Sequence, residues 1–251
     1  MRWLAIALAG GCASAGTDQP GQVDSGQQQT DSGTTMQDSS MTDSSMVMID
    51  APVGPMTRTL TQTTSQTLKA GNTIACSNST TGHTRDNSFY RVFDLPAMGI
   101  NAAFTVSQVS FQVEHCDHIN NTGCVVAVRV GTYAGTPGAT LTPASITILA
   151  SNASVPVPEI IENPGPPPTT PGGTVNAPIT ATIPAGSKLV VQVEAPDGNN
   201  LYSFFMGSND GGESGFGYIM SGTCSITNPT NISTLGTPAP RHLLLNVTGM
   251  Y

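Results

Sequence analysis

Positive charge is scarce in this sequence. Only 8 of its 251 residues are lysine or arginine, they form no run, and the formal net charge at pH 7 is −8. Proteins that bind nucleic acid neutralise phosphates with clustered lysine and arginine side chains. We therefore expect no nucleic-acid partner.

Helical patterns and long apolar segments are missing as well. No stretch repeats apolar residues convincingly at helical spacing, and none beyond the N-terminus is long enough to span a bilayer. Glycine (27 residues) and proline (19 residues) are abundant, together with threonine, serine and valine. This composition favours short strands joined by turns, and therefore an all-β protein.

The first residues, MRWLAIALAGGCASAG, have the layout of an export signal. Arg2 supplies a positive charge, a short apolar core follows, and small residues lead to Cys12. The segment resembles a bacterial lipoprotein signal, although such signals usually carry leucine where this chain has Ala9. The resemblance implies that residues 1–12 direct export and that a lipid on Cys12 anchors the protein at the outer membrane or surface of a bacterium. Cleavage after Ala15 is an alternative, and it would give a secreted protein without Cys12.

Residues 13–68 have the composition of a disordered tether. The segment is rich in serine, threonine and glutamine, and its first part carries aspartates with no lysine or arginine among them: Asp18, Asp24, Asp31, Asp38, Asp43 and Asp50. Its apolar surface is too small to offset the entropy lost on ordering, and repulsion between the aspartates extends the chain. We predict an acidic tether that separates a folded domain from the membrane.

From Lys69 onward the chain consists of short runs in which apolar and polar residues alternate. In VSQVSFQVE, the residues Val109, Phe111 and Val113 share one face, whereas Glu114 lies on the other face with serine and glutamine. Eight or more such runs are separated by glycine, proline, asparagine and aspartate. We predict that residues 69–251 form one antiparallel β-sandwich, with a jelly-roll-like arrangement.

Residues 155–178, VPVPEIIENPGPPPTTPGGTVNAP, form a proline-rich insertion between two of the predicted strands. Its prolines favour a polyproline II conformation and cannot donate to the interior of a β-ladder. We expect the insertion to cross from one sheet to the other or to project as an exposed loop, as a spacer rather than as a peptide ligand.

Several phrases together resemble a β-sandwich domain that occurs as an accessory module in secreted bacterial proteins: DNSFYRVFDL, IPAGSKLVVQVEAPDG, FFMGSN, CSITNPTNI and HLLLNVTG. The resemblance covers roughly Ile74 to Gly249. This family has no established activity, so the resemblance implies a fold and an exported setting rather than a mechanism. We expect a secreted or surface-anchored, non-catalytic binding or structural module. A carbohydrate-binding module and an enzyme of unknown type are the alternatives.

The cysteine pattern predicts disulfides. Besides Cys12, the chain has four cysteines, and an even number in an exported domain favours disulfides, with three possible pairings. Cys116 and Cys124 flank a predicted hairpin loop at a separation that a cross-strand disulfide can span. This pairing leaves Cys76 to bond with Cys224.

A zinc site is the alternative for the same segment, because His115 and His118 lie beside Cys116. Zinc requires thiolates and imidazoles that converge tetrahedrally, but neighbouring residues of a strand point to opposite faces. An oxidising compartment also converts thiols into disulfides. We therefore predict two disulfides and no metal at these residues.

Tyr133 is the candidate for carbohydrate binding, because the turn-forming sequence AGTPG follows it and sugars stack on exposed aromatic rings. Tyr90 and Tyr202 lie within apolar strand runs, so we expect both in the core.

Loop carboxylates offer a weak calcium site. Asp197, Asp210 and Glu213 lie in glycine-containing loops whose oxygens suit calcium, but the same residues are typical of turns, and we favour turns. Ser214, in GGESGFG, faintly resembles a protease nucleophile but lacks the second glycine and a matching base. We predict no catalytic residue and no cofactor; the expected partners are a membrane through Cys12 and a glycan or surface protein.

Overall fold

The computed structural model describes residues 54–161, 172–236 and 240–251. The predicted export signal (1–12) with Cys12, most of the predicted tether (13–68) and the centre of the proline-rich insertion lie outside these residues. Within the described residues the structure is all-β, with two short turns of 3-10 helix at Pro143–Ser145 and Ile232–Thr234. This part of the chain contains no helix of the length and apolarity that a membrane span requires.

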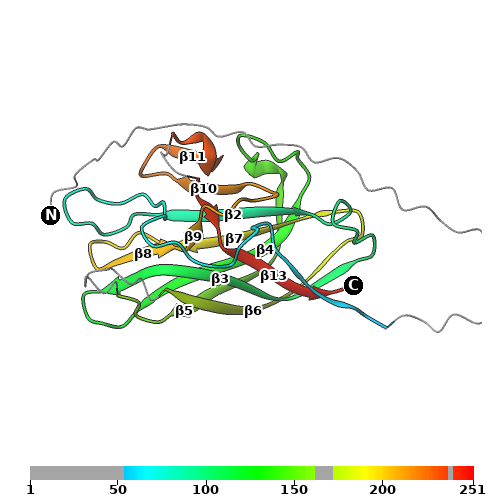
Figure 1. Cartoon of the computed structure of the whole chain (residues 1–251), viewed down its shortest axis with the longest axis horizontal. Coiled ribbons are helices and arrows are strands. Elements are labelled where there is room, and N and C mark those ends of the chain that lie inside the picture. Colours follow the sequence, from blue (N-terminus) through cyan, green and yellow to red (C-terminus); the bar gives the residue numbers. More distant parts are fainter. Residues whose placement is uncertain (1–53, 162–171, 237–239) are drawn as a thin grey trace, which may run out of the picture. The chain divides into compact units, whose positions relative to one another are not determined.

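Two antiparallel sheets pack together, as the predicted β-sandwich requires. The five-stranded sheet has the order β1–β13–β3–β6, and β8 also pairs with β3; the six-stranded sheet has the order β11–β10–β2–β7–β4–β5. Most connections pass from one sheet to the other. As a result, strands that are neighbours in a sheet are often far apart in the sequence; β3 and the last strand, β13, are an example (Figure 1). The strands of the first sheet are β1 (Thr57–Leu60), β3 (Phe104–His118), β6 (Gly173–Ile183), β8 (Tyr202–Met206) and β13 (Leu245–Met250). Those of the second are β2 (Asn87–Asp94), β4 (Cys124–Tyr133), β5 (Ile146–Val157), β7 (Lys188–Ala195), β10 (Gly217–Ser221) and β11 (Ile226–Asn231), and β9 (Ser208–Asn209) pairs separately with β12 (His242–Leu243).

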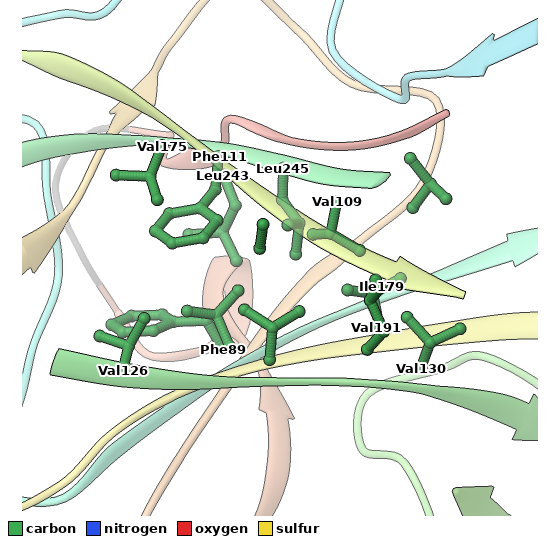
Figure 2. Close-up of a cluster of buried hydrophobic side chains, with 14 of the residues drawn as sticks. Phe89, Val109, Phe111, Val126, Val130, Val175, Ile179, Val191, Leu243 and Leu245 are labelled. Carbon is green, nitrogen blue, oxygen red and sulfur yellow. The ribbon is translucent and has the colours of Figure 1, made fainter. Parts of the chain in front are cut away.

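The core lies between the two sheets and follows the period-two pattern of the sequence. Figure 2 shows Val109 and Phe111 of β3 on one side of the core, and Phe89 and Val126 of the six-stranded sheet on the other. These side chains are almost completely buried. The predicted inward face of β3, which includes Val113, is therefore confirmed.

Glu114 departs from this pattern. The register of β3 against β8 shifts between Val113 and His115, which marks a β-bulge at Glu114. The side chain of Glu114 is only 2% exposed, and its Oε1 accepts a hydrogen bond from the backbone N–H of Gly71 at 2.6 Å. The Glu114 side chain is therefore covered by the segment before β2 rather than exposed to solvent, which the local alternation does not predict.

The folded domain begins before Lys69. Strand β1 pairs with β13 along its whole length, and Met56 and Tyr251 exchange two backbone hydrogen bonds of 2.9 and 3.1 Å. The prediction that the tether extends to residue 68 is therefore wrong. A strand of four residues with one buried side chain, Leu60, gives almost no alternation to detect, and its partner is distant in sequence.

The ends of the predicted insertion 155–178 belong to strands. Residues 155–157 close β5 and residues 173–178 open β6, so the prediction that the whole segment is outside the sheets is wrong at both ends. Both strands lie at sheet edges, where one side of the strand has no partner strand. Pro156 and Pro178 are tolerated there, because a backbone N–H on the open side of an edge strand makes no ladder hydrogen bond. The expected crossing between the sheets is confirmed, because β5 and β6 belong to different sheets.

Candidate functional site

All four cysteines of the domain form disulfides. Cys116 is bonded to Cys124 with their Cα atoms 6.1 Å apart, and Cys76 is bonded to Cys224 with their Cα atoms 5.9 Å apart. Both predicted pairings are confirmed. The alternative zinc site at these residues is wrong, because its sulfur ligands are consumed in the Cys116–Cys124 bond.

The loop at residues 118–123, between β3 and β4, is held at both ends by one carboxylate. Glu159 accepts hydrogen bonds from the backbone N–H groups of His118 (3.1 Å) and Gly123 (2.8 Å). Gly123 has a φ of +71°, and a Cβ atom there would lie 2.2 Å from the carbonyl oxygen of Val157, so only glycine fits. The loop is therefore rigidly positioned by Glu159 together with the Cys116–Cys124 bond.

A groove of about 370 Å³ runs beside this loop, lined by His118, Thr122, Gly123, Cys124, Val125, Pro196, Leu201 and Tyr202. The rings of His118 and Tyr202 stack with centroids 6.2 Å apart. The Tyr202 hydroxyl donates to the carbonyl of Pro196 at 2.8 Å, and burial, with the nearby Asp197 charge, raises the pKa of Tyr202 to about 12. Tyr202 thus packs against the main core, as predicted, but it is only partly buried and also lines a surface groove.

Tyr133 is only 3% exposed, so the predicted exposed aromatic platform at this residue is wrong. The segment after β4 folds back over the outer face of the six-stranded sheet, and the Tyr133 hydroxyl accepts a hydrogen bond from the backbone N–H of Thr142 at 3.3 Å. Tyr133 packs there in a second apolar cluster with Leu141, Tyr90 and Tyr218. The predicted burial of Tyr90 is confirmed.

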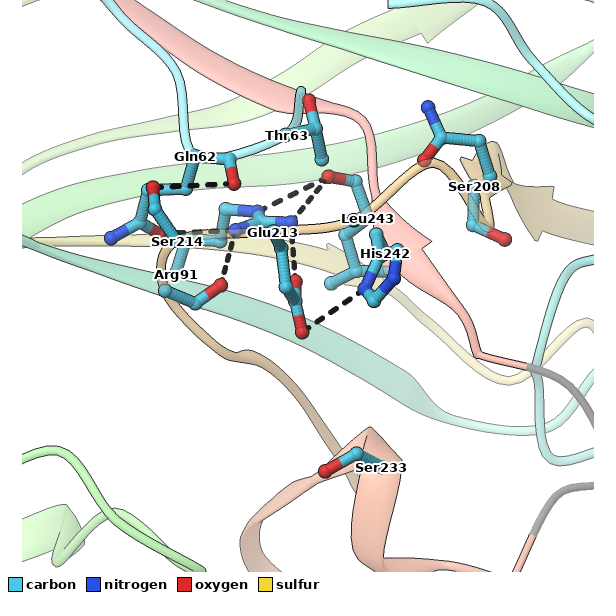
Figure 3. Close-up of polar contacts among 12 residues, drawn as sticks. Gln62, Thr63, Arg91, Ser208, Glu213, Ser214, Ser233, His242 and Leu243 are labelled. Atoms are coloured by element: carbon cyan, nitrogen blue, oxygen red, sulfur yellow. Dashed lines mark hydrogen bonds and ion pairs between the residues drawn. The ribbon is translucent and has the colours of Figure 1, made fainter. Parts of the chain in front are cut away.

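Arg91 lies at the centre of a buried polar cluster that the sequence analysis did not identify (Figure 3). Its five N–H donors are all used. Nε and Nη2 donate to the carbonyl of Leu243 (3.1 and 2.7 Å), and Nη1 donates to the carbonyl of Gly215 (2.8 Å) and to Gln62 Oε1 (3.1 Å). Nη2 also donates to Glu213 Oε2 at 3.0 Å. Arg91 therefore joins three segments that are far apart in the chain, and we name this set the Arg91 cluster.

Glu213 completes the cluster. Its Oε2 pairs with Arg91, and its Oε1 lies 3.2 Å from Nδ1 of His242. Burial lowers the pKa of Arg91, and the Glu213 charge opposes this shift. The sequence does contain a pattern that indicates the burial of Arg91. Arg91 alternates with Phe89 and Phe93 along β2 and therefore lies on the same, inward face of the strand.

The three carboxylates of the weak calcium prediction are not brought together. Glu213 belongs to the Arg91 cluster, Asp210 pairs with Lys69, and Asp197 lies 3.6 Å from Arg85. In the part of the chain that the structure describes, no group of three or more His, Cys, Asp or Glu side chains is arranged to hold a metal ion.

A pocket of about 270 Å³ lies against the Arg91 cluster, at a gap in the six-stranded sheet. Strand β10 begins at Gly217, opposite Arg91, so the edge of β2 beyond Arg91 is not covered by β10. Gln62 fills part of this gap and donates to the carbonyl of Val92 at 2.8 Å. The pocket, which we name the Phe216 pocket, is lined by Gln62, Val92, Asp94, Pro137, Glu213, Ser214, Gly215, Phe216 and Tyr218.

The Phe216 pocket combines an exposed ring with polar side chains. The Phe216 side chain is 44% exposed, and its ring meets the buried Tyr218 ring edge to face at 6.4 Å. Asp94 accepts one hydrogen bond, from the backbone N–H of Ala97 at 3.2 Å, and forms no ion pair with another described residue. The Ser214 hydroxyl donates a hydrogen bond to the carbonyl oxygen of Gln62 at 3.5 Å.

Comparisons of the chain with protein-family models, with curated proteins and with solved structures found no match.

Proposed function

We propose that this protein is an exported, non-catalytic module that binds a carbohydrate in the Phe216 pocket. The observation that carries the proposal is an exposed aromatic ring beside polar side chains in one preformed hollow. Sugars are bound by apolar contact of a ring face with an aromatic side chain, while nearby polar groups hydrogen-bond the hydroxyls. Phe216 supplies the platform, and Asp94 and Ser214 supply the polar groups.

The Arg91 cluster makes the walls of this pocket rigid. Arg91 binds Gln62, Glu213 and Gly215, and each of these residues also lines the pocket. A pocket formed before the ligand arrives avoids the entropy cost of ordering its walls. This arrangement supports binding as the role of the site.

The same contacts support a non-catalytic role. General acid–base catalysis needs a side chain that is free to exchange a proton with the substrate. Glu213 Oε2 is paired with Arg91, and Glu213 Oε1 lies 3.2 Å from His242 Nδ1. The Arg91 pair therefore commits one oxygen of this carboxylate to holding the loop.

The groove beside Tyr202 is less suited to a sugar. His118 Nδ1 accepts a hydrogen bond from the backbone N–H of Asn120 at 3.1 Å, and the Tyr202 hydroxyl donates to Pro196. One ring nitrogen of His118 and the Tyr202 hydroxyl are therefore already committed to hydrogen bonds within the protein, which leaves fewer groups to orient a ligand.

Glycan-array screening followed by calorimetry tests this proposal. Phe216→Ala should lower the affinity of the selected glycan about tenfold or more, because the stacking surface is lost. Leu201→Ala is the matched control, since Leu201 is an equally exposed apolar side chain (44%) at the Tyr202 groove. Unchanged affinity in Phe216→Ala, or a loss in Leu201→Ala instead, would contradict the proposed site. Turnover of glycoside or ester substrates by the unaltered protein would contradict the non-catalytic role.

The proposed location at the outer membrane or surface of a bacterium rests on the lipoprotein-like signal. The two disulfides fit an oxidising compartment. Cys12→Ser should release the protein from the membrane fraction into the soluble fraction, because lipid attachment at this residue would be the anchor. The measurement is cell fractionation; the same distribution for Cys12→Ser and the unaltered chain would favour cleavage after Ala15.

A further inference from the structure

The outer face of the five-stranded sheet carries no ionisable side chain over four neighbouring strands. Its outward side chains come from β1, β13, β6 and the first part of β3, strands that lie side by side (Figure 1). They are Thr57, Thr59, Thr105, Ser107, Gln108, Ser110, Gln112, Thr174, Asn176, Pro178, Thr180, Thr182, Asn246, Thr248 and Met250, all exposed or partly exposed. We name this surface the neutral face.

The side chains of the neutral face hold one another across the strands. The hydroxyls of Thr59 and Thr248 are 2.9 Å apart, and those of Thr105 and Thr182 are 3.2 Å apart. Gln108 extends the pattern by donating to Asn176 at 2.9 Å. Each hydroxyl keeps a further hydrogen-bonding position, so the face presents fixed polar groups that can still bind a partner.

The composition of this face decides which partner it fits. Protein interfaces depend on buried aromatic and arginine anchors, and the neutral face has neither. Anionic polymers require lysine or arginine, which are also absent from it. An uncharged polysaccharide offers only hydroxyls, ether oxygens and C–H groups, and it can approach this surface without stripping water from an ion.

The regular spacing of the polar groups favours a polymer over a single small ligand. Strands of one sheet lie about 4.8 Å apart, and outward side chains repeat about every 6.8 Å along each strand. Thr180 and Thr182 of β6 and Thr57 and Thr59 of β1 are such repeats. A chain of repeating sugar units can meet this array at many positions at once.

The neutral face is joined to the Phe216 pocket by the segment at residues 61–66. Gln66 Nε2 donates to the hydroxyl of Thr61 at 2.9 Å, and its Oε1 accepts from Asn246 at 2.6 Å. Gln112 donates to the carbonyl of Gln66 at 2.5 Å, while Gln62 lines the pocket. The same short segment therefore contacts both surfaces.

We propose that the ligand is an uncharged polysaccharide, which lies along the neutral face, while the Phe216 pocket on the six-stranded sheet binds a sugar ring of the same or a neighbouring polysaccharide chain. This inference rests on the proposed function and names its ligand class. Two contributions to the binding affinity are expected. The pocket binds one or a few sugar units, and the neutral face adds affinity only for a long polysaccharide chain.

Retention on insoluble cellulose and chitin, compared with calorimetry on cellohexaose and chitohexaose, tests the inference. The variant Asn176→Asp/Thr180→Glu places two negative charges on the exposed edge strand β6. It should lower retention on the polymer about tenfold or more, through the cost of desolvating the charges, and leave binding of the hexasaccharide unchanged. The matched control, Thr147→Glu/Ser151→Asp, places the same charges on exposed positions of β5 in the other sheet and should change neither.

The outcomes distinguish this inference from the proposed function. Unchanged retention of Asn176→Asp/Thr180→Glu, or no retention of the unaltered protein on either polymer, would overturn the inference while the pocket could still bind the hexasaccharide. Phe216→Ala should lower binding of both polymer and hexasaccharide; if it lowers neither, the proposed function fails. Equal melting temperatures of the variants show that all of them are folded.

Discussion

At the scale of single residues, Arg91 places a cation in a position where the β2 pattern calls for an apolar side chain. Its charge is tolerated because every donor has a partner and Glu213 supplies the counter-charge. Removing one member of such a pair leaves the other charge buried and unpaired, which costs more than the intact pair contributes.

Arg91→Met should therefore lower the free energy of unfolding by about 3–5 kcal/mol. Arg129→Met is the control, because the Arg129–Glu194 pair is about one-third exposed and should contribute about 1 kcal/mol or less. The measurement is equilibrium unfolding in denaturant. Similar losses in the two variants would contradict the structural role assigned to the Arg91 cluster.

Asp86 gives the domain an acid-sensitive contact near the Cys76–Cys224 bond. Partial burial tends to raise the pKa of Asp86, but hydrogen bonds from Thr223, Gly222 and Ser221 outweigh this and leave the pKa below its ordinary value of 3.8. A carboxyl whose pKa is lower in the folded state stabilises the fold above its ordinary pKa, and this contribution is lost as the pH falls through the lower folded value.

Asp86→Asn should accordingly be less stable than the unaltered protein at pH 6, by on the order of 1 kcal/mol, because the charged acceptor is lost. The difference should shrink below about pH 3.8, where the unaltered Asp86 takes up a proton. Unfolding free energies of both proteins from pH 6 to pH 2 measure the effect. A difference that stays constant over this range would show that the Asp86 charge does not contribute.

At the scale of elements, the segment from Gly54 to Lys69 belongs to the folded domain. Strand β1 buries Leu60 and extends the five-stranded sheet, and Gln62 supplies partners to Arg91 and to the carbonyl of Val92. Loss of this segment exposes apolar surface of β13 and leaves polar groups of the Arg91 cluster unsatisfied.

A chain that starts at Lys69 should therefore be less stable than one that starts at Gly54, by at least about 3 kcal/mol. Thermal and denaturant unfolding of the two chains provide the comparison. Equal stability would restore the sequence-based boundary at Lys69 and remove β1 from the domain.

A strand could be predicted from the sequence where the residues that determine its position are close together in the chain. Alternation within β3 is local, and it correctly placed Val109 and Phe111 inside. The bulge at Glu114 and the burial of Tyr133 depend on pairing with β8 and on the fold-back of residues 134–145, which no local pattern contains. Strand β1 was missed for the same reason, since its only partner is the last strand.

The candidate site was less predictable than the fold. The Phe216 pocket assembles residues near 62, 92–94, 137 and 213–218, so its existence depends on tertiary contacts alone. Arg91 could have been found from its inward position between Phe89 and Phe93. Phe216 could not, because a single phenylalanine in a glycine-rich turn gives no sign of what surrounds it.

At the scale of the whole molecule, the two disulfides close loops of very different length. Cys76 and Cys224 are separated by 148 residues, whereas Cys116 and Cys124 are separated by 8. In the chain-entropy model a longer closed loop removes more freedom from the unfolded chain.

Cys76→Ala/Cys224→Ala should therefore destabilise the domain by about 4–5 kcal/mol, against about 2–3 kcal/mol for Cys116→Ala/Cys124→Ala. Denaturant unfolding of the two double variants measures both values. Intact mass before and after reduction should show that the remaining bond still forms in each variant. A larger loss from removal of the Cys116–Cys124 bond would mean that the rigid 118–123 loop, rather than loop length, controls stability.

The two backbone hydrogen bonds between Met56 and Tyr251 have a topological consequence. They place Met56 and Tyr251 next to each other near the two ends of the domain, so a short glycine–serine linker can join Tyr251 to Gly54 without strain. A circular permutant that is closed in this way and opened in the exposed loop at residues 101–103 should fold with both disulfides intact. For the same reason, the whole domain can be inserted into a surface loop of another protein, because it enters and leaves the host chain at a single point.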